Sequence, residues 1–357
     1  MINKNTIINK NNLKNKEKMK EISELQELFE EINKLKSKAR MNRCQFCTEL
    51  TVSDNDEYLE FHFSLLEQKK EYFQSDLKLY FTFRRDREKV YYFLKNKLKT
   101  LHDEKLQNDV NEILKELNFC NLEELKQWLK DLKSEKRKDE DKFIYSIMRS
   151  PYTEYHYSLM TDKTINEKFR SELWRRFDEH REKGAELLLS KLDNNEDTEF
   201  YPEIIYCLGR FADQLKMAKE RTLEYARKFA GSDNDFLRNR AIIVLGWIGD
   251  IEDISLLGEH LLNDKNAKCR TWSATSFMQM YFRRKSQSLV DKALPFLKQA
   301  ISQETDYFAL GCMIDVVKEL TGKKFDLPQS AIDNVDTEKI DSAKLKVERF
   351  FKKLYHE

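Results

Sequence analysis

Two stretches of the sequence decide the fold: Ile204-Ile-Tyr-Cys-Leu-Gly-Arg-Phe-Ala-Asp213 and Ala241-Ile-Ile-Val-Leu-Gly-Trp-Ile-Gly-Asp250. Each is a mostly apolar run that contains one Leu-Gly pair and ends in an aspartate. We predict that both are helices, and that the glycine of each pair lets a stacked helix approach closely. The final aspartate of each run is then placed to cap the helix that follows.

Helix pairs recur around these stretches at an interval near 37 residues. The expected pairs are 185–192 with 199–212, 217–230 with 235–248, 251–262 with 267–284, and 289–301 with 306–320. Such a period is typical of an α-solenoid, in which each pair buries its apolar face on its neighbours and is not stable alone. The predicted fold class is therefore all-α, an α-solenoid of antiparallel helix pairs preceded by an N-terminal helical region.

The two quoted stretches, 204–213 and 241–250, resemble the Ala-x-x-x-Leu-Gly-x-Ile-Gly-Asp pattern of HEAT repeats, in particular their bacterial lyase-type variants. Gly209 and Gly246 match the glycine of that pattern. Asp264 and Arg270 match an Asp/Arg ladder that in this family links the loops of adjacent repeats, and Pro295 lies where the family often kinks its first helix. The last repeat departs from the pattern, since the residues that follow Gly311 do not read x-Ile-Gly-Asp. The resemblance covers residues 185–325 well and residues 55–180 weakly.

The N-terminal region is less regular. Residues 1–15 are rich in Asn and Lys and read as a disordered tail. Apolar residues at helical spacing predict an amphipathic helix over 17–40. Residues 42–85 are ambiguous, because alternating aromatic and polar residues also fit strands. The helical interpretation is favoured, with Asp54 or Asp56 capping a helix that runs to residue 70, and Ser75 or Asp76 capping the next.

Further helices are expected over 89–101, 104–117 and 122–133. A charged run over 133–142 marks the junction between two halves. The predicted domains are a tail (1–15), an N-terminal helical region (16–142), the repeat solenoid (143–325), and a C-terminal part (326–357). In that last part, 332–341 is expected to be a linker and 342–355 a capping helix.

Composition limits the classes of function. Residues 1–43 hold 11 Lys/Arg and 6 Asp/Glu, which leaves 53 against 57 for the remainder of the chain. A near-neutral body argues against a duplex-DNA partner, since binding to phosphates needs a basic surface. The opening residues lack the apolar core of a secretion signal, and the longest apolar run, 241–249, is too short to span a bilayer. We expect a cytoplasmic protein with no membrane association.

Few residues suggest a catalytic or metal-binding site. Cys44 and Cys47 form a CxxC motif, but no second ligand pair accompanies it, so no metal site is expected. The six histidines show no repeated metal-ligand spacing, and no Gly-rich phosphate loop or GxSxG motif occurs. We therefore expect a protein that is not an enzyme and holds no cofactor.

Basic and aromatic residues on the second helices suggest a binding groove on the concave face instead, because arginine, tryptophan and tyrosine supply most hot spots of protein interfaces. The candidate residues are Tyr201, Arg210, Arg238, Arg240, Trp272, Tyr281, Arg283 and Tyr307. The alternative is that half of the aromatic residues belong to the core. We expect a protein partner, and a bacterial immunity protein that blocks a toxin is one such role.

Two other functions compete. A nucleic-acid binder would need its arginines clustered on the concave face. An enzyme similar to the HEAT-like alkylpurine DNA glycosylases would need Trp247 or Trp272 exposed beside a carboxylate such as Asp213 or Asp250. Against both, residues 166–320 hold 24 basic and 26 acidic side chains. The sequence does not predict an oligomeric state.

Overall fold

The computed structural model describes residues 21–36, 40–53, 55–69, 73–84, 86–117, 119–212 and 215–356. Within these ranges the regular structure is helical throughout and contains no strand. The predicted tail (1–15), Asp54 and Asp213 lie outside the described residues. The chain divides into two compact units, the first ending at His180 and the second beginning at Arg181.

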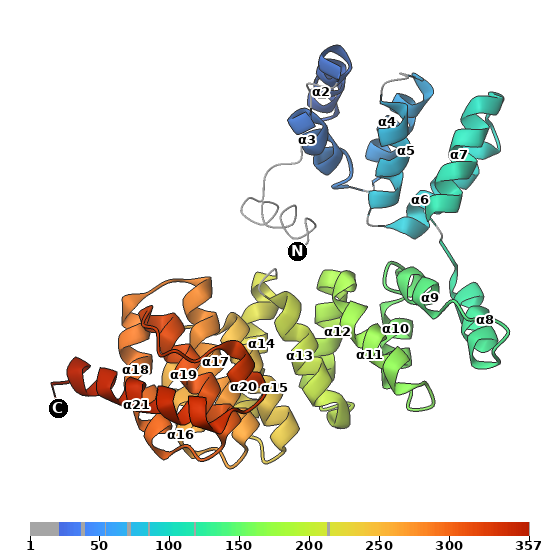
Figure 1. Ribbon diagram of the computed structural model, residues 1–357. Helices are drawn as coiled ribbons and strands as arrows, with labels where there is room; N and C mark the ends of the chain where they lie inside the picture. The colour runs from blue at the N-terminus through green and yellow to red at the C-terminus, as the bar shows by residue number, and fades with distance from the viewer. Residues whose placement is uncertain are drawn as a thin grey trace. The chain divides into compact units, whose positions relative to one another are not determined.

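The first unit is built from short helices (Figure 1). Its helices are α2 (Ile22–Leu35), α3 (Arg40–Leu50), α4 (Asp56–Glu67), α5 (Gln74–Phe83), α6 (Arg87–Leu98), α7 (Glu104–Leu117), α8 (Leu122–Lys133), α9 (Glu140–Ile147), α10 (Thr153–Thr161) and α11 (Glu167–Arg176). The helical interpretation of 42–85 is confirmed, and the helices expected over 104–117 and 122–133 are found with those bounds.

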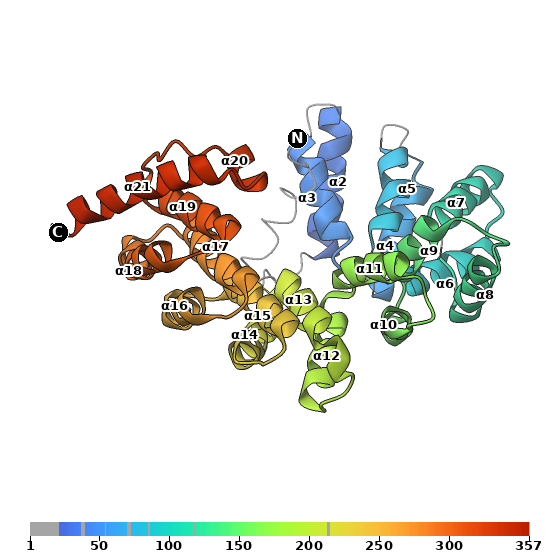
Figure 2. The same cartoon turned by 60° about the horizontal axis from the view of Figure 1, so that its bottom comes forward.

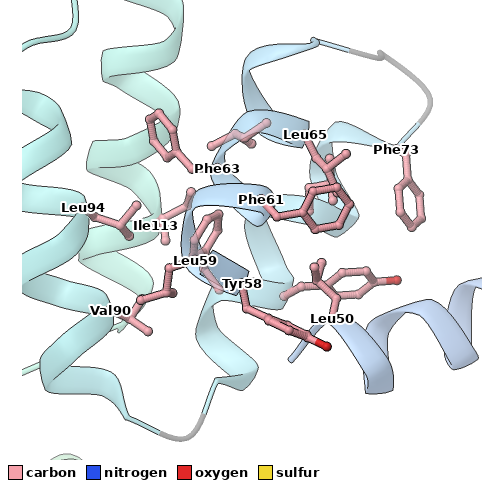
Figure 3. Close-up of a cluster of buried hydrophobic side chains, with 14 of the residues drawn as sticks. Leu50, Tyr58, Leu59, Phe61, Phe63, Leu65, Phe73, Val90, Leu94 and Ile113 are labelled. Carbon is pink, nitrogen blue, oxygen red and sulfur yellow. The ribbon is translucent and has the colours of Figure 1, made fainter. Parts of the chain in front are cut away.

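One apolar core joins α2 to α7 in this unit. Figure 3 shows Leu59 and Phe63 of α4 lying against Val90 of α6 and Ile113 of α7. Almost the whole circumference of α4 is buried, including His62. Its apolar residues therefore lack a clean helical stripe, which explains why the same sequence also resembles alternating strands.

The helix expected over 17–40 is wrong at its C-terminal end. Helix α2 stops at Leu35, and Lys36 has a φ of 52°, which an α-helix does not allow. The chain then folds back, so that the ring of Phe46 on α3 lies 5.8 Å from the ring of Phe29. Burial of these aromatic rings compensates for the unfavourable backbone conformation of Lys36.

The predicted helix caps in this region also differ from the structure. Asn55 caps α4, because its side chain accepts a hydrogen bond from the amide of Tyr58 at 2.9 Å. Asp56 belongs to the first turn of the same helix, which ends at Glu67 rather than at residue 70. Phe73, not Ser75 or Asp76, holds the cap position of α5, where it makes no side-chain hydrogen bond with the helix.

The charged run over 133–142 does not separate the two compact units. Trp128 of α8 reaches across it: its indole donates to Asp139 at 3.0 Å, and its ring packs edge-on against Phe143 at 5.7 Å. These contacts keep α8 and α9 in one unit. The division falls after His180, whereas the sequence places a domain boundary at 142.

The second unit has two rows of helices (Figure 2). The first helices are α12 (Arg181–Asp193), α14 (Lys216–Ala230), α16 (Ile254–Asn263) and α18 (Gln287–Gln303). The second helices are α13 (Tyr201–Ala212), α15 (Asp235–Ile248), α17 (Ala267–Arg283) and α19 (Tyr307–Thr321). Figure 2 shows this second-helix row on the inner side of the arc that the unit forms. The predicted helix pairs are confirmed, and Pro295 lies inside α18.

The C-terminal end closes the array. Helix α21 (Thr337–Leu354) packs on α18 and α19, and the short helix α20 (Gln329–Asp333) packs on α19. The linker expected over 332–341 is therefore wrong, since residues 337–341 already belong to α21 and 332–333 to α20. Ile340 and Ala343 of α21 are buried, so the capping helix begins where its apolar face meets the last repeat.

Two buried histidines of the first unit have fixed hydrogen-bond partners. His62 accepts from Arg84 Nε at 3.1 Å through Nδ1 and donates through Nε2 to the Leu77 carbonyl at 3.0 Å. His156 likewise donates through Nε2 to the Leu173 carbonyl at 3.1 Å, and its Nδ1 lies 2.8 Å from His180 Nε2. Carbonyl oxygens only accept, so each imidazole carries a proton on Nε2, and the hydrogen bond that Nδ1 of His62 accepts from Arg84 makes that ring neutral.

We expect the stability of the first unit to fall in mild acid. Burial, and then the neighbouring Arg84 or His180, lowers the pKa of each imidazole well below 6.5. The unfolded chain takes up these protons below pH 6.5 and the folded chain does not, so stability is retained above that pH. Below it, each histidine removes about 1.4 kcal/mol per pH unit.

Urea unfolding at pH 7.5 and 5.5, followed by circular dichroism, checks this. The double variant His62→Gln/His156→Gln offers matching amide donors and acceptors without titration, so its stability should change less between the two pH values. A wild-type midpoint that is the same at both pH values would refute the expectation.

Candidate functional site

Close packing holds the second-helix row together. A Cβ atom placed on Gly246 of α15 would lie 2.9 Å from the Cα of Ser276 on α17, and closer still to Gln279 Oε1. Ser276 Oγ also donates to the Ile242 carbonyl at 3.0 Å. Gly209 of α13 meets the side chain of Val244 on α15 in the same way. The predicted reason for small residues at 209 and 246 is thus confirmed.

A ladder of buried ion pairs links the loops of adjacent repeats. Arg238 binds both carboxylate oxygens of Asp264, at 2.7 and 2.8 Å, and Arg270 binds both oxygens of Glu304 at 2.7 Å. Each arginine also donates to a carbonyl six residues before it, Ser232 for Arg238 and Asp264 for Arg270. The guanidinium of Arg270 therefore pairs with the next repeat, and only its backbone-directed bond joins it to Asp264.

The first turn after α15 uses Asp250 as a cap. Its carboxylate accepts from the amide of Glu252 at 3.0 Å, and its own amide donates to Asp253 at 3.0 Å. This agrees with the capping role predicted for the aspartate that ends the apolar run. The counterpart, Asp213, lies outside the described residues.

An aromatic–arginine cluster, made of Tyr206 from α13 and Phe236, Arg240 and Trp247 from α15, lies in the second-helix row. The guanidinium carbon of Arg240 is 4.1 Å from the centre of the Tyr206 ring and 4.9 Å from that of Phe236. Trp247 packs on Tyr206 at 4.8 Å. Phe236 is 47% exposed, and the other three members are partly exposed. The rings of Tyr206 and Phe236 hold the guanidinium of Arg240 in place, while one side of the cluster stays open to solvent.

Charge in the cluster is not balanced by a local carboxylate. Within the described residues Arg240 makes no ion pair, and its buried Nε has no hydrogen-bond partner. An arginine held between aromatic rings keeps its planar N–H edges available for a carboxylate. The arrangement therefore suits an acidic group supplied by another molecule.

The structure separates the eight residues that the sequence nominates for binding. Tyr201 and Arg238 are only 8% and 6% exposed, so they serve packing and the ladder. Tyr307 donates from its hydroxyl to Asp341 of α21 at 3.2 Å. Arg283 is exposed and donates to the Gly246 carbonyl at 2.9 Å, at the C-terminal end of α15. The remaining residues are partly exposed on α13, α15 and α17: Arg210, Arg240, Trp272 and Tyr281.

Sequence reasoning missed Tyr206 and Phe236. Tyr206 occupies an unspecified position of the repeat pattern, three residues before Gly209, and such positions are the ones free to point outward. Phe236 follows the first residue of α15 and precedes the buried Leu237. The available signal was an aromatic residue at an outward position beside Arg240, which one sequence alone does not separate from the core.

The described residues provide few groups that would bind a metal ion or act as a nucleophile. They contain no group of three or more His, Cys, Asp or Glu side chains that would hold a metal ion. In the CxxC motif, burial raises the pKa of Cys47 to about 12, which disfavours a reactive thiolate. No helix in the described part of the chain is long and apolar enough to cross a membrane.

Comparison with known proteins points to the same architecture. The family model of HEAT repeats matches residues 185–277, which run from the first turns of α12 into α17. No curated protein matches the chain. HEAT repeats generally mediate protein–protein interaction, and the family is typically a non-catalytic scaffold. The all-α fold, the stacked second helices and this match together support a HEAT-like repeat architecture for the second unit.

Proposed function

We propose that the second-helix row of the second unit binds a protein partner, with the aromatic–arginine cluster at the centre of the contact. The observation that carries the proposal is Arg240, held between the rings of Tyr206 and Phe236 and without a carboxylate partner among the described residues. Aromatic and arginine side chains in such a setting dominate the energetics of protein interfaces.

Charge and exposure define the partner's chemistry. A carboxylate on the partner would pair with Arg240, and an apolar side chain would cover Phe236. Burying the exposed ring removes apolar surface from water, while the ion pair fixes the register of the two proteins. The partner is therefore a protein whose contact surface combines an Asp or Glu with apolar residues.

The proposed mode of action is occlusion or scaffolding without catalysis. Stacked repeats present a preformed surface, so little ordering entropy opposes binding. Masking of a toxin by an immunity protein is one role of this kind, and the cytoplasmic location expected from the sequence would place it inside the cell. Both remain proposals.

The test compares capture of partners from nuclease-treated lysate of the source cells by the tagged full chain and its variants. Phe236→Ala/Arg240→Ala should weaken binding of the captured protein by about 2–4 kcal/mol, because it removes two hot-spot side chains. Titration with the purified partner measures this loss. Unchanged affinity in a variant with wild-type circular dichroism would place the site elsewhere.

A residue in the row of first helices provides a matched control. Lys292→Ala removes an exposed side chain of α18 and should leave affinity unchanged. If a partner is captured only from lysate that has not been treated with nuclease, and its capture falls steeply with added salt, the partner is a nucleic acid and the proposal fails.

A further inference from the structure

Two arginines of the first unit gather around one tyrosine, far along the chain from the second-helix row. Arg87, the first residue of α6, is only 6% exposed. Its Nη1 donates to the Leu117 carbonyl at 2.6 Å and its Nη2 to the Thr82 carbonyl at 2.9 Å. These carbonyls lie at the C-terminal ends of α7 and α5, where partial negative charge accumulates. Arg87 is thereby fixed in place.

Arg149 brings a second positive charge to the same position. Its guanidinium carbon lies 4.1 Å from the centre of the Tyr145 ring, and that of Arg87 lies 5.9 Å from the same centre. The Tyr145 side chain also interacts with the Arg87 guanidinium. Tyr145 is 41% exposed and Arg149 is partly exposed, so this three-residue group, the Arg87–Arg149–Tyr145 site, opens to solvent on one side.

No carboxylate of the residues that the structure describes neutralises these charges. Among the described residues neither Arg87 nor Arg149 forms an ion pair. Burial, and next the positive charge of the nearby Arg149, lowers the pKa of Arg87. The helix ends contacted by Arg87 offset its charge in part, whereas the contact that Arg149 makes in the described part of the chain is with the face of the Tyr145 ring. An unmatched cation beside a buried one favours a bound anion.

We propose that the Arg87–Arg149–Tyr145 site binds a phosphate-type oxyanion. The guanidinium of Arg149, stacked on the Tyr145 ring, presents its N–H edge sideways to the oxygens of a tetrahedral anion, and the fixed charge of Arg87 beside it adds to the attraction. The hydroxyl of Tyr145 adds a donor. The anion is either free phosphate or the phosphate of a small monoester, whose organic part would meet the exposed Tyr145 ring.

Calorimetric titration of the full chain with inorganic phosphate and, separately, with phenyl phosphate tests the site at constant ionic strength. The wild type should bind at least one of them saturably with a Kd of about 10 mM or tighter. Arg149→Gln should weaken that binding about tenfold, since it removes a charged fork but not the capping contacts of Arg87. Arg170→Gln, on α11 and also partly exposed, is the matched control and should bind like the wild type.

Each outcome is decisive. Equal affinity for the two ligands assigns the site to the oxyanion alone, and tighter binding of phenyl phosphate assigns it to a monoester. If neither ligand saturates, or if Arg149→Gln binds as well as the wild type, the proposal is overturned. Circular dichroism confirms that the Arg149→Gln variant remains folded.

Discussion

Replacing Gly246 by leucine is expected to destabilise the repeat array by about 3 kcal/mol or more. Even a single Cβ atom at this position would lie 2.9 Å from the backbone of Ser276, and a leucine adds three further carbons. Side chains can rotate away, but here the obstacle includes the backbone of α17, so α15 and α17 must separate. Separation would also break the hydrogen bond from Ser276 to the Ile242 carbonyl.

Urea unfolding of the wild type, Gly246→Ala and Gly246→Leu measures the effect. The loss should increase from alanine to leucine, because the inserted volume increases. Gly231→Leu is the matched control: a Cβ there meets only the Lys228 carbonyl, at 3.5 Å, and stability should change little. A leucine at 246 that left the midpoint unchanged would contradict the packing described for α15 and α17.

Replacing Arg238 by alanine is expected to cost about 3–5 kcal/mol. The side chain of Asp264 is only 2% exposed, and the change would leave its carboxylate buried without its arginine. His260 Nδ1 lies 3.1 Å from the same carboxylate and does not replace the two-bond contact. The cost comes from an uncompensated buried charge more than from the lost attraction.

A second variant separates these two contributions. Arg238→Met/Asp264→Leu removes both charges and keeps apolar volume, so it should recover most of the stability lost by Arg238→Ala. Lys346→Ala, which breaks an exposed ion pair with Asp326, should cost less than about 1 kcal/mol. Thermal and urea unfolding measure all three. An Arg238→Ala protein as stable as the wild type would mean that the ladder does not hold the repeats together.

The ladder of ion pairs also makes the stability of the repeat array depend on pH, because its carboxylates must stay ionised. Burial alone would raise the pKa of Asp264 and of Glu304. Hydrogen bonds from Arg238 or Arg270 and from backbone amides, together with the charge of the arginine, outweigh burial and keep both pKa values below normal. The stabilisation from each carboxylate is complete above its unfolded pKa and is lost as pH falls through the folded pKa. This loss occurs in stronger acid than the loss caused by the buried histidines of the first unit.

Helix positions in the second unit were predictable because each repeat carries its own signals. The apolar run that ends at Ile248 and the polar loops around it predict both ends of α15 correctly. Gly246 marks the point at which α17 approaches α15 closely. The turn at Lys36 carried no such signal, since no glycine or proline stands there and only the contact of Phe46 with Phe29 determines it. Long-range contacts of this kind are not encoded in local spacing.

The residues of the candidate sites were likewise predictable from the sequence only in part. Arg240 was predictable as an exposed arginine on a second helix, whereas Arg238, two residues away, faces the ladder and is buried. Only the packing of α15 shows which of the two points outward. The Arg87–Arg149–Tyr145 site joins residues from distant parts of the chain, so their meeting depends on how α5, α6, α7 and α9 pack.

Site-specific photo-crosslinking tests the central claim, that the second-helix row binds a protein. A benzophenone amino acid is placed at position 236 or, as control, at position 292 of α18, and the full chain is irradiated with its captured partner. Crosslinks to the partner are predicted from position 236, reduced by Arg240→Ala, and absent from position 292. Crosslinks from 292 alone, with none from 236, would contradict the claim.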